Sequence, residues 1–161
     1  MKAMVRKWWW LPVVALSVLA VAALARPSRS ATAACAPLHR GVLPAWARTG
    51  FSDPRPRIPH ALGRDGRIAA ILFGDLVAPP LKDRGNKILW VARDPVKALS
   101  DLRISAQRVE DGHPVGPPVR RVVVGGPGPS GVDMPATGCW RMTLRWSGRT
   151  DRLELRYGPR E

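Results

Sequence analysis

The sequence predicts an all-β protein, and three observations support this class. About six or seven short apolar or alternating segments follow one another from residue 67 onward, separated by turn residues. The 17 prolines and 15 glycines are numerous for a helical protein and suit short strands joined by turns. The 161 residues, less an N-terminal leader, allow one hydrophobic core but not two. Together they predict a small antiparallel immunoglobulin-like β-sandwich behind an N-terminal apolar helix.

Composition divides the chain into three parts. Residues 1–33 form an apolar leader, residues 34–60 an extended linker and entry segment, and residues 61–161 the β-sandwich domain. Pro54, Pro56 and Pro59 lie near the end of the second part and favour extended backbone there.

The first predicted strands are apolar runs. Residues 68–73 and 87–93 form two such runs, separated by a loop that contains Pro79 and Pro80. Residues 102–107 then alternate apolar with polar side chains, which is typical of a half-buried strand.

A hairpin turn and a further strand follow. Asp111 and Gly112 form an Asp-Gly pair, which favours a tight hairpin turn, and residues 119–124 form the next predicted strand. Residues 125–131 are almost all glycine and proline, so we expect them to be irregular.

The last two predicted strands form the clearest hairpin. They are joined by a turn at Ser147 and Gly148. One face of the hairpin is predicted to be core, and it carries Trp140, Met142, Leu144, Trp146, Leu153, Leu155 and Tyr157. The opposite face is polar and carries Arg141, Thr143, Arg145, Arg152, Glu154 and Arg156.

The leader indicates export. Lys2, Arg6 and Lys7 precede 18 residues without a charge, and small residues follow at positions 31–33. This is the tripartite pattern of a secretory signal peptide, with cleavage after Ala33 or, alternatively, after Ala25. Eighteen apolar residues also reach the lower limit for a retained single-span anchor. Both outcomes place the domain outside the cytoplasm, either secreted or on the extracytoplasmic face of the cell membrane.

The net charge of +14 bears on partners. Five of the 26 basic residues and none of the 12 acidic ones lie within residues 1–33, so the remainder carries +9. Such a charge favours anionic envelope polymers or lipid headgroups. No basic run reaches the density of a nucleic-acid arm, and export argues against a genomic target, so no nucleic-acid partner is expected. The plain alternative is a solvated basic surface.

Residues 135–140, Pro-Ala-Thr-Gly-Cys-Trp, followed by an alternating strand, a glycine turn and a final strand, resemble the "GCW" ending of uncharacterised exported or lipoprotein-like bacterial domains. Residues 86–91 and 125–130 also resemble segments of actinobacterial secreted proteins. The resemblance implies an immunoglobulin-like fold and an exported address, and it implies no activity.

The two cysteines, Cys35 and Cys139, are expected to form a disulfide, because export places them in an oxidising compartment. The alternative is that Cys35 is lipidated or removed. Residues 32–35 resemble a lipobox, although Thr32 stands where a leucine is usual and follows a polar stretch.

Chemical motifs are sparse. The chain has three histidines, and neither an H-x-x-x-H nor a C-x-x-C spacing is present, so no metal, cofactor or catalytic residue is assigned and the protein is not expected to be an enzyme. Asp75, Asp94 and Asp133 show no pattern of an acid/base pair.

Two functions remain open. The first is an exported, non-catalytic cell-envelope binding domain, for which an exposed aromatic platform of Trp46, Trp90, Trp140 and Trp146 is one conceivable surface. The alternative is an immunoglobulin-like protein that binds a soft metal such as copper. Its ligands would come from Cys35, His39, Met134, Cys139 and Met142.

Overall fold

The computed structural model describes residues 35–97 and 100–160. The leader expected at residues 1–33, with its cleavage and anchoring alternatives, lies outside these ranges. Within them, no helix is long and apolar enough to cross a membrane.

The described residues form eight strands and one short 3-10 helix, η1 (Ala45–Ala47). The strands are β1 (His60–Leu62), β2 (Ile68–Leu72), β3 (Lys87–Ala92), β4 (Leu102–Glu110), β5 (His113–Val123), β6 (Pro129–Gly131), β7 (Gly138–Trp146) and β8 (Arg149–Tyr157).

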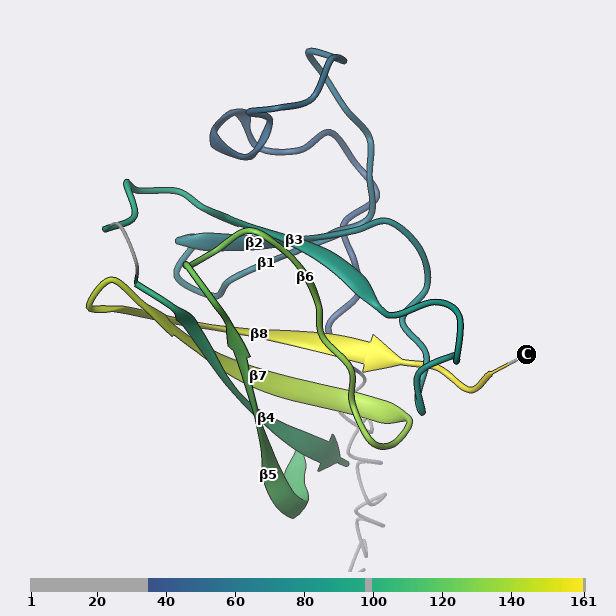
Figure 1. The fold of residues 1–161 in the computed structure, drawn as a ribbon. Coiled ribbons are helices and arrows are strands. Elements are labelled where there is room, and N and C mark those ends of the chain that lie inside the picture. The colour runs from purple at the N-terminus through teal and green to yellow at the C-terminus, as the bar shows by residue number, and fades with distance from the viewer. Residues whose placement is uncertain (1–34, 98–99, 161) are drawn as a thin grey trace, which may run out of the picture.

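The strands form two antiparallel sheets packed face to face, with orders β1-β2-β3-β6 and β5-β4-β7-β8 (Figure 1). The chain crosses between sheets after β3, β5 and β6, and it forms hairpins at β4–β5 and β7–β8. Strands β2 to β8 therefore follow an immunoglobulin-like path, to which β1 adds an edge strand. The predicted all-β sandwich is confirmed.

Both predicted hairpin turns are confirmed. Asp111 and Gly112 have φ angles of 49° and 80°, and Ser147 and Gly148 have φ angles of 45° and 73°. Positive φ at both central residues is the type I′ geometry, whose twist matches that of the strands it joins. Aspartate and serine tolerate the left-handed conformation at the first position, and glycine adopts it at the second without steric cost.

One expectation was wrong in part. Residues 125–131 were expected to be irregular, yet Pro129, Ser130 and Gly131 form β6 and pair with β3. Proline is tolerated there because β6 is an edge strand, where a missing N–H donor need not break a ladder on both sides.

The main core fills the space between the sheets. Trp90 from β3 and Trp140 and Trp146 from β7 are all buried in this core. The β8 residues Leu153, Leu155 and Tyr157 line the same core, as the alternation predicted. The Tyr157 hydroxyl donates to the carbonyl of Val132, and burial is the main cause that raises the pKa of this phenol well above its usual value.

A second, smaller core lies on the outer face of the β1-β2-β3 side. The segment between Cys35 and β1, expected to be an extended entry segment, folds back over this sheet in the blue part of Figure 1. Leu43 and Ala47 from this segment pack with Ala69 and Ile71 from β2, and Trp46 and Phe51 lie against them. Strand β2 is therefore buried on both faces, which explains its uninterrupted apolar sequence.

A buried carboxylate joins the two sheets. Asp151 in β8 is 1% exposed and accepts hydrogen bonds from the backbone N–H groups of Asp65 (3.0 Å) and Arg67 (2.9 Å), in the β1–β2 turn. Gly63 lies directly against this carboxylate, and a Cβ there would collide with it.

We expect Trp146→Ala to lower the free energy of unfolding by about 3–5 kcal/mol, because it leaves a cavity that the surroundings refill only partly. Arg145→Ala, one residue away on the solvent side of β7, should cost less than about 0.5 kcal/mol. Chemical denaturation of both variants measures the difference. Equal losses would contradict the assignment of Trp146 to the core.

Candidate binding face

The outward side of the β5-β4-β7-β8 sheet carries a concentration of arginine. Successive side chains along β4, β7 and β8 point alternately into the core and outward, and the outward ones are mostly polar. We call this surface the basic face, and its arginines are Arg103, Arg120, Arg141, Arg145, Arg152 and Arg156, all of them exposed.

The acid on this face is Glu154, which forms an ion pair with Arg141 at 3.0 Å. The other five arginines form no ion pair with any described residue. Arg103 lies directly opposite Arg145 in the β4–β7 register. Like charges directly opposite one another destabilise a sheet, so this arrangement is not explained by stability.

A shallow depression marks one end of the basic face. It is open to solvent and is lined by residues that include Arg103, Ser105, Arg120, Val122 and Arg145. The register places Arg120 opposite Ser105, and Ser105 opposite Thr143. Guanidinium and hydroxyl groups from three adjacent strands therefore converge there. These donors suit phosphate or carboxylate oxygens.

The two sheets differ in what covers them. The segment that follows Cys35 packs over the outer face of the β1-β2-β3 side, whereas no described residue covers most of the outer face of β5-β4-β7-β8. Among residues 35–97 and 100–160, the basic face is therefore a broad exposed sheet surface.

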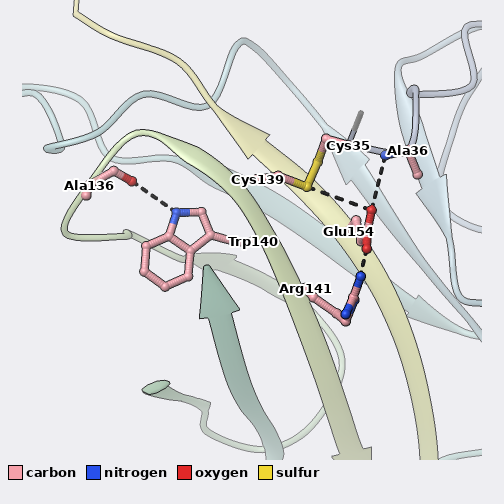
Figure 2. The surroundings of a disulfide bond; sticks show 7 residues. All are labelled: Cys35, Ala36, Ala136, Cys139, Trp140, Arg141 and Glu154. Atoms are coloured by element: carbon pink, nitrogen blue, oxygen red, sulfur yellow. Dashed lines mark hydrogen bonds and ion pairs between the residues drawn. A yellow bond between two sulfur atoms is a disulfide. The ribbon is translucent and has the colours of Figure 1, made fainter. Parts of the chain in front are cut away.

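The disulfide closes one end of the basic face (Figure 2). Cys139 points outward from β7 and is bonded to Cys35, with an S–S distance of 2.13 Å and a Cα–Cα distance of 5.4 Å. Glu154 receives a hydrogen bond from the backbone N–H of Ala36 at 3.2 Å through one oxygen and binds Arg141 through the other. The chain at Cys35 is thus held at the end of this face.

The local sequence around Cys139 explains this geometry. Gly138 has a φ of 128°, a conformation that residues with side chains rarely adopt, and a Cβ there would lie 3.4 Å from Arg108. Cys139 then faces outward to the disulfide, while Trp140 faces inward and donates its Nε1–H to the carbonyl of Ala136 at 3.0 Å. Gly138 thus begins β7, Cys139 forms the covalent link, and Trp140 belongs to the core.

The soft-metal ligand set is not gathered among the described residues. Met134 and Met142 are buried in the main core, whereas Cys139 lies on the opposite side of the same sheet. His39 is stacked against His60, with ring centroids 5.3 Å apart. The sulfur atoms of Cys35 and Cys139 lie within 4.8 Å of a Glu154 oxygen, but both sulfurs are in the disulfide.

The tryptophans and carboxylates do not form a site either. Trp90, Trp140 and Trp146 are in the main core, and the half-buried Trp46 lies against the second core, so these four form no exposed aromatic platform. Two of the three aspartates considered above have structural partners: Asp94 forms an ion pair with Arg149 at 2.9 Å, and Asp133 accepts a hydrogen bond from Asn86.

The sequence predicts arginines on the polar side of individual strands but does not show that they share one surface. Arg103, Arg145 and Arg152 each occupy the polar phase of an alternating strand. The sequence does not give the order of the strands. These arginines share one surface because β4, β7 and β8 are neighbours in the sheet.

We expect non-reducing digestion of the protein, taken from cells whose free thiols were first alkylated, to yield one peptide pair that links Cys35 to Cys139. Cys139→Ser should lower the melting temperature, because the disulfide closes a loop of 104 residues, for which chain entropy gives about 4.7 kcal/mol as an upper figure. Alkylated cysteines, or a diacylglycerol on Cys35, would contradict the disulfide.

The basic face and the disulfide are features of this chain's own residues. No protein-family model matches the chain, and no curated protein or solved structure matches it.

Proposed function

We propose that the protein is an exported, non-catalytic interaction domain of the cell envelope that binds an anionic component through its basic face. The observation that supports the proposal is this sheet surface with six arginines and one glutamate, which no other segment of residues 35–97 and 100–160 covers. Five guanidinium groups without an ion pair among the described residues leave unbalanced positive charge on it.

Two features support the exported address. The leader at residues 1–33 has the pattern of a secretory signal or anchor, and the disulfide is of the kind that persists in oxidising compartments. The resemblance of residues 135–140 to the ending of exported bacterial domains agrees with both. The role is that of a binding domain because the basic face is an open surface of a hydrogen-bonded sheet and offers charge rather than an enclosed reaction site.

The proposal is tested with long-chain polyphosphate as a soluble polyanion. We expect the full chain to bind it and the face variant Arg103→Gln, Arg120→Gln, Arg145→Gln, Arg152→Gln to bind much more weakly. Loss of four phosphate contacts should also reduce the slope of log K against log salt by about three, given roughly 0.7 per contact on a single-stranded polyanion.

The matched control removes the same charge elsewhere, through Arg55→Gln, Arg57→Gln, Arg84→Gln and Arg93→Gln. These four arginines are exposed, lie outside the basic face and form no ion pair with a described residue. The control should keep the affinity and salt slope of the wild type within about twofold. Equal losses in both variants would show that net charge, and not the basic face, determines binding, and would refute the proposal.

A further inference from the structure

We infer that the anionic component is a phospholipid bilayer, and that the basic face lies against its headgroup phosphates. This inference rests on the proposed function and narrows its ligand. It follows from exposed apolar residues beside the basic face, from the charge of the alternative occupants, and from the position of Cys35.

Exposed valines flank the arginines at one end of the basic face. Val122 is 55% exposed and lies opposite Arg103 in the β4–β5 register, and Val124, just beyond the end of β5, is 86% exposed. Val96, 38% exposed, belongs to the same end of the sandwich, because it adjoins Gly126, two residues after Val124. A soluble polyanion offers no apolar phase for these side chains. A bilayer offers both phosphates and, a few ångströms deeper, the acyl boundary.

The charge of the basic face excludes two other occupants. Residues 1–33 carry five basic residues and no acidic one, so they do not complement it. A second copy of this face would bring six arginines and one glutamate against the same set, which is repulsive. An anionic surface remains as the complementary partner.

The geometry of the sheet suits many headgroups at once. Neighbouring strands lie about 4.8 Å apart, so Arg103 and Arg145 on β4 and β7 present adjacent guanidinium groups. Arginine is suited to this task because its planar fork binds phosphate oxygens in pairs. Arg120 and Arg152 lie at the two ends of the next row, which runs from β5 to β8 through Ser105 and Thr143.

The disulfide gives the face its orientation. Cys35 is bonded to Cys139 at one end of the basic face, and Val122 and Val124 lie towards the other. A leader retained in the membrane, which its 18 residues without a charge allow, would keep this face next to the bilayer. The tethered face would then meet headgroups at a high effective concentration.

Binding of the full chain to vesicles tests the inference. Phosphatidylcholine vesicles with and without 30% phosphatidylglycerol are compared, at low and high salt, for the wild type and the face variant. Each arginine near anionic lipid contributes about 1 kcal/mol to the free energy of binding. The face variant lacks four of them, so its preference for anionic vesicles should be several hundredfold lower than that of the wild type. It should also fall steeply with salt in the wild type, because salt screens charges on the surface. Whatever the leader contributes is common to both proteins.

A second variant separates lipid from polymer. Val124→Gln should weaken binding to anionic vesicles about threefold, because its side chain, which does not line the depression on the basic face, loses its place in the interface. It should leave polyphosphate binding unchanged. Phe73→Gln is the matched control: it removes a 58% exposed apolar side chain at the end of β2, outside the basic face, and should change neither binding.

The outcomes distinguish the two proposals. Equal binding of the wild type to both vesicle types, or a valine variant that binds anionic vesicles as the wild type does, overturns the lipid inference. Polyphosphate binding that still depends on the basic face would in that case leave the proposed function standing. A face variant that matches the wild type on polyphosphate and on vesicles refutes both.

Discussion

The period-two register of β7 is the constraint on which the rest of the structure depends. This strand lies between β4 and β8, and its inward residues Trp140, Met142, Leu144 and Trp146 supply a large part of the main core. Its outward residues supply the disulfide and part of the basic face. A slip of one residue would place arginines in the core and tryptophans in solvent. Core burial therefore enforces the exposure of Arg141 and Arg145.

The outer faces of the two sheets differ in what packs against them. One sheet has its outer face covered by the segment that follows Cys35, so hydrophobic residues on both faces of β2 are buried. In the described part of the chain, the other sheet is covered at one end, where Cys35, Cys139 and Val109 form a small cluster. The disulfide thus anchors the chain at the edge of the basic face without hiding its arginines. Such an arrangement presents charge from a rigid framework, and ordering on binding costs little when the framework is already fixed.

The strands, and which of their residues face inward, could be predicted from the sequence better than the order of the strands in each sheet. Alternation at residues 102–107 and at Trp140–Trp146, with the turns at Asp111-Gly112 and Ser147-Gly148, was sufficient to place β4, β7 and β8, because these patterns are local. Pairing of β6 with β3 was missed, since glycine and proline give no local strand preference there. The basic face was missed for a related reason. Its arginines come from four strands, and only the sheet order brings them together.

The most direct measurement places a fluorophore on the basic face itself. Both native cysteines are in the disulfide, so a thiol introduced by Thr143→Cys, at the centre of the basic face, can be labelled selectively with an environment-sensitive dye. Ser52→Cys, on the exposed opposite side of the molecule, provides the comparison. The account predicts a blue shift of the dye at position 143, and none at position 52, when full-length protein meets anionic vesicles. An equal response at both positions, or a response at position 52 alone, would contradict the assignment of the basic face to the membrane.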